Sequence, residues 1–211
     1  KEYSIGISAF GRSRDWRRAV SLLEQMRSEG VEPDVVALGA AISACDKGGQ
    51  WKLAIDLLAK APSAGLKPNA ICYNAAISAC SRAAEWQQAL SLFDDMRQAG
   101  IAPTVVSYNS AISGCAKAGE WQRALSLLLE VSSAGLTPTH ITFNAAMAAC
   151  AKGGHWEQGV ALLVAMRRTG LAPTVVTFNT LISACEKGKE WERALALLAE
   201  MRTEGIQPDV I

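Results

Sequence analysis

The six tryptophans of this chain are separated by a constant interval of 35 residues, at Trp16, Trp51, Trp86, Trp121, Trp156 and Trp191. Six glycines and six prolines keep the same interval, at Gly30, Gly65, Gly100, Gly135, Gly170 and Gly205 and at Pro33, Pro68, Pro103, Pro138, Pro173 and Pro208. A fixed period of about 20–50 residues is typical of stacked repeats and not of one globular core. The period therefore predicts a single continuous array of repeats over residues 1–211.

The register of the tryptophans divides the chain into copies of one unit. A partial copy fills residues 1–34, full copies fill residues 35–69, 70–104, 105–139, 140–174 and 175–209, and residues 210–211 open a further copy. Because the first copy is incomplete and the last has barely begun, we expect the chain to be a piece of a longer array. Protein partners are expected to be reached through the flanking regions.

Composition limits the class of protein only loosely. Hydrophobic residues make up 50 % and charged residues 19 % of the chain, as in ordinary soluble folds. No run approaches the roughly 20 apolar residues of a membrane-spanning helix, so no membrane partner is expected. A net charge of +1 does not by itself indicate a polyanionic partner. A nucleic-acid interface must therefore be argued from where the charges lie.

The cysteines follow the repeat instead of a disulfide pattern. Five recur at the repeat interval, at Cys45, Cys80, Cys115, Cys150 and Cys185, and Cys72 is the exception. A disulfide framework usually shows dense and varied spacing in a small secreted chain. Free cysteines are among the residues most often buried. We expect six reduced, buried thiols.

One repeat, residues 105–139, shows what each unit folds into. Tyr108, Ile112 and Cys115 follow helical spacing and predict a first helix. A second helical stripe follows Gly119 and Glu120, and consists of Trp121, Ala124, Leu125, Leu128 and Val131. Gly135 followed by Leu136 predicts a left-handed C-cap, and Pro138 prevents the helix from continuing. Each repeat is therefore predicted to be a pair of antiparallel helices.

The predicted fold class is all-α, because the Ala- and Leu-rich composition favours helix and β-branched residues cluster only at Val105, Val106 and their counterparts. Glycine-rich stretches such as residues 152–154 are interpreted as turns, since they lack the strand and the Lys-Ser/Thr arrangement of a phosphate-binding loop. The six tryptophans open amphipathic stripes and are assigned to the core.

The first helix of each repeat carries a second, mostly polar stripe. In the copy at residues 105–139 it comprises Val106, Asn109, Ser113 and Lys117, whose offsets return to within about 60° of one direction at 100° per residue. The core stripe points roughly 100° away from it. The counterparts in the other copies are Lys1, Ser4, Ser8 and Arg12; Val36, Gly39, Ser43 and Lys47; Ile71, Asn74, Ser78 and Arg82; Ile141, Asn144, Ala148 and Lys152; and Val176, Asn179, Ser183 and Lys187.

Stacking the repeats would align these stripes in parallel rows. One row holds the cations Arg12, Lys47, Arg82, Lys117, Lys152 and Lys187. Phosphates and bases of a single-stranded polymer fit a cation row beside a hydrogen-bonding row that advances by one residue per repeat. A different interpretation is that the cations are solvated residues that the helix dipole favours at a helix C-terminus, and that the asparagines are ordinary polar residues near a helix N-terminus. The coincidence of three rows on one face favours the first interpretation.

The repeats resemble those of pentatricopeptide repeat proteins. The resemblance rests on the 35-residue period, the Val-Val-Ser-Tyr-Asn and Val-Val-Thr-Phe-Asn openings, Ala-Leu-Ser-Leu in the second helix and Gly-Ile-Gln-Pro-Asp at the end of a unit. It covers the whole chain and recurs six times. Tetratricopeptide repeats have a 34-residue period and place their tryptophan in the first helix, whereas Trp121 opens the second.

This resemblance implies a right-handed superhelix of helix pairs that binds single-stranded RNA with one repeat per nucleotide. It implies a location in a mitochondrion or plastid and a role in RNA processing, stability or translation. In that family the second residues of adjacent repeats sandwich a base, and here these are Val36, Ile71, Val106, Ile141, Val176 and Ile211. Lys1 departs from this pattern because it is not aliphatic.

The fifth and last residues of a repeat read the base edge in that family. The pairs here are Ser4 and Asp34, Gly39 and Asn69, Asn74 and Thr104, Asn109 and Thr139, Asn144 and Thr174, and Asn179 and Asp209. Family preference assigns G to Ser/Asp, a pyrimidine leaning to C to Asn/Thr, and U to Asn/Asp. The implied target is close to 5′-GACCCU-3′. Gly39 departs from the pattern because it has no side chain, so the A rests on Asn69 alone.

No enzymatic activity or cofactor is expected. The two histidines, His140 and His155, stand at positions held by other residues in the other copies, and the sequence has no Cys-x-x-Cys or His-x-Glu for a zinc site. A protein-binding helical scaffold is the alternative to RNA binding, because solenoid surfaces commonly bind partner proteins. The repeated asparagine and cation stripe favours RNA, since a peptide-binding groove is expected to vary more from repeat to repeat.

Overall fold

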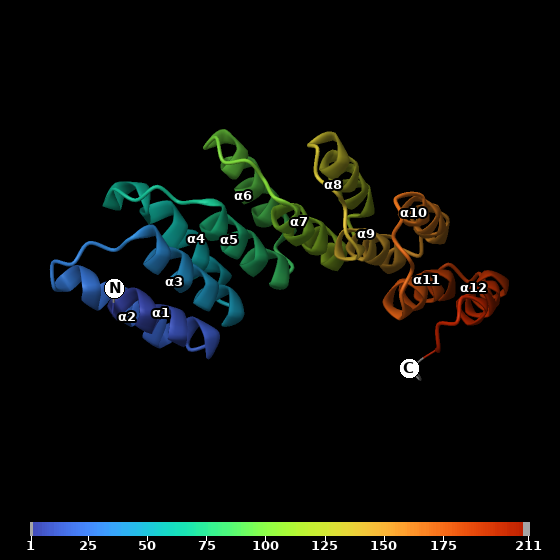
Figure 1. Ribbon diagram of the computed structural model, residues 1–211, viewed down its shortest axis with the longest axis horizontal. Helices are drawn as coiled ribbons and strands as arrows, with labels where there is room; N and C mark the ends of the chain where they lie inside the picture. Colours follow the sequence, from blue (N-terminus) through green and yellow to red (C-terminus); the bar gives the residue numbers. More distant parts are fainter. Residues whose placement is uncertain (1, 209–211) are drawn as a thin grey trace. The chain divides into compact units, whose positions relative to one another are not determined.

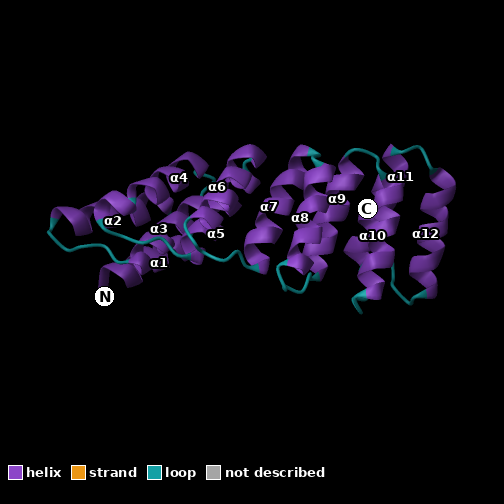
Figure 2. Cartoon of the chain, turned by 90° about the horizontal axis from the view of Figure 1, so that it is seen from above, coloured by secondary structure: helices purple, strands orange, loops and turns teal. Residues whose placement is uncertain are grey.

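The computed structural model describes residues 2–208. Helices account for the regular structure of this part of the chain, and no strand occurs in it (Figure 2). The helices are α1 (Glu2–Arg12), α2 (Trp16–Ser28), α3 (Val35–Lys47), α4 (Trp51–Lys60), η1 (Pro62–Ala64), α5 (Ala70–Arg82), α6 (Trp86–Gln98), α7 (Val105–Ala118), α8 (Trp121–Ser133), α9 (His140–Lys152), α10 (Trp156–Arg168), α11 (Val175–Lys187) and α12 (Trp191–Thr203). The prediction of an all-α array of helix pairs is confirmed.

The chain forms two compact units, residues 1–114 and 115–211, and the boundary falls within α7. In the first unit the helices α1, α3 and α5 lie side by side, and α2 and α4 each contact the first helix of their own repeat and that of the next (Figure 1). In the second unit α9 contacts α11, and α10 contacts both. Each unit therefore consists of a layer of first helices covered by a layer of second helices.

The predicted core stripes are buried between these layers. Tyr108, Ile112 and Cys115 of α7 are at most 2 % exposed, and Ala124, Leu128 and Val131 of α8 are also buried. Leu125, which was predicted to belong to the second stripe, is only partly buried. All six cysteines are free and buried, as predicted. Burial raises the pKa of Cys45, Cys80, Cys115 and Cys150 to about 11, so these thiols are neutral near pH 7.

The predicted helix ends are present as well. Gly135 has a φ of 73°, and the amide of Leu136 donates to the carbonyl of Val131 at 3.0 Å, which closes the C-cap of α8. In the repeat of residues 35–69 the second helix ends early, at Lys60, and a 3-10 turn follows. Pro62 lies at the start of that turn, and it lacks the N–H that an α-helix would need there.

The assignment of the tryptophans to the core is wrong. Trp16, Trp51, Trp86, Trp121 and Trp156 are only partly buried, and Trp191 is 67 % exposed. Each is the first residue of a second helix, so it lies at the edge of the two layers. There the indoles of Trp16 and Trp156 cover the glycines that end the first helix of the following repeat, Gly48 and Gly188, so closely that a Cβ on either glycine would come within 2.8 Å of the ring. These rings pack between repeats at the helix turns, and not within the core.

Candidate nucleic-acid interface

The second residue of each complete first helix is an aliphatic side chain that faces solvent. Val36, Ile71, Val106, Ile141 and Val176 are all 59–66 % exposed. Isolated exposed aliphatics are normal on protein surfaces, but these recur at one position of every full repeat. Ile211, the last predicted member of this row, lies outside the described residues. The row offers flat apolar contacts at one place in each repeat.

Beside this row lies the fifth residue of each repeat. Asn74 and Asn109 in the first unit and Asn144 and Asn179 in the second are partly buried, as is Ser4. Gly39 is buried, and a Cβ placed on it would lie 3.5 Å from Cys72 Sγ. The side-chain oxygen of Asn109 is buried without a hydrogen-bond partner in the described part of the chain. Four of the six positions therefore present an amide at the surface of a first helix.

The last residue of four repeats has a structural role that was not predicted from the sequence. Asp34, Asn69, Thr139 and Thr174 are the N-caps of α3, α5, α9 and α11. The Asp34 carboxylate accepts from the amide of Ala37 at 2.7 Å, for example. The signal that could have revealed this role is the Thr-x-x-Thr or Thr-x-x-Ser pattern that opens three repeats, because it resembles a capping box. Asp209 lies outside the described residues.

Two pairs of fifth and last residues are brought into contact. Asn74 Nδ2 donates to Thr104 Oγ1 at 3.4 Å, and Ser4 Oγ donates to Asp34 Oδ1 at 3.5 Å. Both distances are at the long end of hydrogen bonding. Each pair is adjacent in space although its members are about one repeat apart in sequence.

A third residue, which was not predicted from the sequence, also contacts the amide at the fifth position. Ser107 Oγ donates to Asn74 Oδ1 at 2.6 Å, and Thr177 Oγ1 donates to Asn144 Oδ1 at 2.9 Å. These hydroxyls belong to the third residue of the following repeat, and both side chains are fully buried. A buried hydroxyl therefore holds the amide of Asn74 and that of Asn144 from the side of the protein interior.

The predicted cation row occupies the last turn of the first helices. Arg12, Lys47, Arg82, Lys117, Lys152 and Lys187 are all exposed and lie in the final turns of α1, α3, α5, α7, α9 and α11. A cation is favoured at this end of a helix by the dipole, typically by about 0.3–1 kcal/mol. These cations therefore stabilise the helices whether or not they contact a ligand.

Arg82 and Lys152 of this row contact other groups of the protein. Arg82 Nε lies 3.0 Å from Asp46 Oδ1, and Asp46 also accepts from Ser78 Oγ at 3.2 Å through each carboxylate oxygen. Lys152 Nζ donates to the carbonyl of Lys117. Asp46 was not identified from the sequence, because its effect depends on a neighbour that belongs to the next repeat.

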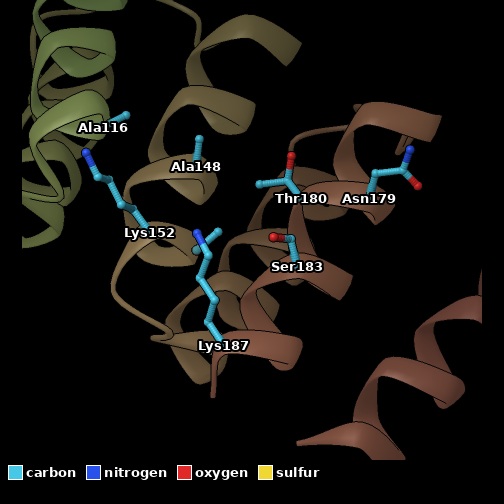
Figure 3. Close-up of a pocket in the computed structure, with 8 residues that line it drawn as sticks. Ala116, Ala148, Lys152, Asn179, Thr180, Ser183 and Lys187 are labelled. Carbon is cyan, nitrogen blue, oxygen red and sulfur yellow. The ribbon is translucent and has the colours of Figure 1, made fainter. Parts of the chain in front are cut away.

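In the second unit the surface between α9 and α11 is hollowed, with a volume of about 460 Å³ (Figure 3). Lys152, Asn179, Ser183 and Lys187 contribute to its lining, and small residues such as Ala148 leave it wide. Figure 3 shows the two lysines extending from neighbouring helices along this hollow. Members of the predicted amide, serine and cation positions thus surround one groove.

Other site classes find no support in the described residues. No group of three or more His, Cys, Asp or Glu side chains among residues 2–208 is arranged to hold a metal ion. Within the same range, no helix is both long and apolar enough to cross a membrane. The His155 and Trp121 rings contact each other at a tilt of 41°, with centroids 4.5 Å apart, and His140 Nε2 lies 3.0 Å from the carbonyl of Ala172. Both histidines therefore make contacts with other parts of the fold.

Comparison with solved structures finds the same fold. The chain matches the pentatricopeptide repeat protein PPR10 in complex with an 18-nt psaJ RNA element at 33 % identity and a TM-score of 0.83, covering 99 % of this chain and 31 % of that one. The structure of PPR10 from maize matches at 32 % identity and a TM-score of 0.71, covering 98 % of this chain and 30 % of that one. The PPR domain of Arabidopsis thaliana protein-only RNase P 1, in complex with tRNA, matches at 16 % identity and a TM-score of 0.69, covering 80 % and 89 %, and shows the fold alone. The chain spans about a third of the PPR10 structures.

Sequence comparison assigns the family. The PPR repeat family matches residues 68–117, 103–152, 138–187 and 173–211, the pentatricopeptide repeat domain matches residues 21–83, and the PPR repeat matches residues 3–31. A comparison with curated protein sequences found no match. The matched segments together cover nearly the whole chain, and the chain belongs to the pentatricopeptide repeat family.

Proposed function

We propose that this protein binds single-stranded RNA sequence-specifically, with one nucleotide per repeat. The observation that carries the proposal is the repetition, on successive first helices, of an exposed aliphatic residue next to a partly buried amide. The PPR10 structure with bound RNA, which is 33 % identical over nearly the whole of this chain, supports the same assignment.

In this proposal the aliphatic residues of adjacent repeats hold a base between them. Helices pack about 8–10 Å apart, and a flat ring with a van der Waals contact on each face needs about 7 Å. Val36 and Ile71 would flank one base, and Ile141 and Val176 another. Such apolar contacts bind every base similarly, since each base has a π-face. The sandwich therefore supplies affinity, and discrimination must come from polar groups.

Discrimination falls to the fifth and last residues of each repeat. An Asn side chain offers both donors and an acceptor to the edge of a base, whereas Gly39 offers neither. With the family preferences given above, the preferred RNA is close to 5′-GACCCU-3′, and the base opposite the Gly39 repeat is the least specified. We infer from the family a function in organellar RNA processing, stability or translation.

Selection from a random RNA pool, followed by sequencing of the retained molecules, tests the proposal. We expect enrichment of a motif with consecutive pyrimidines in the positions assigned to Asn74, Asn109 and Asn144. The duplex form of the same sequence should bind poorly, because paired bases cannot enter between the aliphatic residues. Retention without any sequence enrichment would refute base reading, and absence of retention would favour a protein-binding scaffold.

A further inference from the structure

The third residue of the first helix carries a buried hydroxyl in three repeats, as Ser107, Thr142 and Thr177. Each oxygen accepts a hydrogen bond from the backbone N–H of the preceding cap residue. The donors are Thr104 at 2.9 Å, Thr139 at 2.9 Å and Thr174 at 3.1 Å. A hydroxyl has one proton and two lone pairs, so its proton remains available to a further acceptor.

For Ser107 and Thr177, that proton is directed at the amide of the preceding repeat within the same unit. The distance from Ser107 Oγ to Asn74 Oδ1 is 2.6 Å and that from Thr177 Oγ1 to Asn144 Oδ1 is 2.9 Å. The shorter of these lies in the range of an O–H···O bond and below that of an N–H···O bond. The amide oxygen, and not the amide nitrogen, is therefore the atom turned toward the protein interior.

We propose that Ser107 and Thr177 are positioning residues for base reading, an inference that rests on the proposed function. The buried hydroxyl holds the carbonyl oxygen of Asn74 or Asn144 inward and so turns the NH₂ group toward the base. An outward NH₂ group donates to a base acceptor, such as the O2 atom that both pyrimidines carry. The specificity unit thus has three residues, the fifth and last of one repeat and the third of the next.

The two remaining repeats of the first unit support this grouping, because each lacks both the amide at the fifth position and the hydroxyl at the third position of the following repeat. Cys72 stands at the third position opposite Gly39, and its Sγ lies 3.9 Å from the carbonyl of Val35. Ala37 stands at the third position in the repeat after Ser4. Among the described repeats, an amide at the fifth position therefore occurs only where the following repeat supplies a hydroxyl at its third position. Asn179 is not included, because the repeat that follows it lies outside the described residues.

The direct test is Thr177→Val, which removes the hydroxyl and keeps the side-chain shape. Binding is titrated with four RNAs that differ only at the nucleotide assigned to Asn144. We expect the preference for pyrimidine over purine to fall by about five-fold, the usual worth of one hydrogen bond, while discrimination at the other nucleotides is unchanged. Thr177→Ser restores the hydroxyl and should restore the preference. The matched control Thr169→Val removes a hydroxyl that donates to the carbonyl of Met166 at the end of α10, and should change neither.

An NMR measurement separates this inference from the proposed function, because it needs no RNA. Nuclear Overhauser effects from the Asn144 Nδ2 protons should report one χ2 rotamer in the parent and in Thr177→Ser, with the nitrogen turned away from residue 177, and averaging between the two amide rotamers in Thr177→Val. A single unchanged rotamer in Thr177→Val would overturn the positioning role even if RNA binds. A parent that binds no RNA but shows the rotamer change would overturn the proposed function and leave the orientation by Thr177 established.

A gain-of-function pair guards against loss of folding in Thr177→Val. A Cβ at residue 39 would meet Cys72 Sγ at 3.5 Å and Ile71 Cγ2 at 3.6 Å, which are ordinary contacts, so Gly39→Asn is sterically feasible. We expect Gly39→Asn combined with Cys72→Ser to select pyrimidines at that repeat about five-fold better than Gly39→Asn alone. Equal selection by both variants would count against the hydroxyl.

Discussion

Replacing Asp46 with Asn should strengthen RNA binding, because Asp46 neutralises a member of the cation row. Its carboxylate pairs with Arg82 at 3.0 Å and is held there by Ser78. The Arg82 side chain is 60 % exposed and therefore open to a phosphate, whereas that of Asp46 is 13 % exposed. Asp46→Asn keeps an acceptor for Ser78 and removes the charge.

The size of the effect follows from counterion release. One additional phosphate contact on a single strand adds about −0.7 to the slope of log K against log[salt]. Because Asp46→Asn frees one cation, its slope is expected to be steeper than that of the parent by about 0.7. The same term predicts about four-fold tighter binding at 0.15 M salt, about eight-fold at 0.05 M, and convergence of the two proteins near 1 M.

Fluorescence-anisotropy titrations of one RNA at four salt concentrations measure these slopes. Glu186→Gln is the matched control, because Glu186 is an exposed acid at the same repeat position and its removal changes the net charge equally. It should shift affinity by less than Asp46→Asn and leave the slope unchanged. Parallel slopes for the parent and Asp46→Asn, or equal effects of the two variants, would refute the competition between Asp46 and a phosphate.

Three further predictions concern specificity and stability. Asn179→Thr should shift the preferred base at its repeat from U toward G while the repeats of Asn74 and Asn144 keep selecting pyrimidines, and identical base rankings for parent and variant in titrations of four RNAs would contradict the code. Ala84 has a φ of 63°, so Ala84→Gly should raise the free energy of unfolding by about 0.5–1 kcal/mol in urea titrations, from about 1–2 kcal/mol of relieved strain less the greater entropy of the unfolded glycine chain. A lower free energy of unfolding would show that the strain is absent. Because burial raises the pKa of Cys45, Cys80, Cys115 and Cys150 to about 11, these thiols stay protonated in the folded state while unfolded thiols ionise near pH 9. The contribution of each thiol to the free energy of unfolding should therefore be fully present below pH 9 and fall by about 1 kcal/mol between pH 9 and 10. Cys115→Ala should lessen that fall in thermal or urea melts. An alkaline fall of unchanged size in this variant would exclude the Cys115 thiol as its source.

The sequence predicted the elements of this fold because local signals and the repeat agree. Helical spacing at Tyr108, Ile112 and Cys115, the glycine at Gly135 and the proline at Pro138 all act within one repeat, so they can be interpreted without knowing the stacking. The tryptophans were misplaced for the opposite reason. Their hydrophobicity indicates packing, but what they pack on is the end of a helix in the following repeat, as Trp16 does on Gly48.

For the candidate site, too, the features that lie within one repeat could be predicted, and the contacts between repeats could not. The rows of Val106, Asn109 and Lys117 follow from helical geometry alone, and the exposed aliphatic positions are found where that geometry places them. The Asp46–Arg82 pair and the Ser107–Asn74 hydrogen bond join residues of different repeats, about one repeat apart in sequence. Such contacts depend on the offset between stacked helices, which no single repeat encodes.

The cap residues show how fold and recognition constrain each other at one position. An N-cap accepts backbone N–H groups through a short polar side chain, and its replacement by an apolar residue costs about 1 kcal/mol of helix stability. The last residues of the described repeats are Asp34, Asn69, Thr104, Thr139 and Thr174, which all belong to the set that caps well. A hydrogen bond to a base edge contributes about the same energy. Helix capping and base reading therefore constrain the last residue to a similar degree. Changes of base preference through this position are therefore restricted to Asp, Asn, Ser and Thr, and wider changes must come from the fifth residue, which has no capping role.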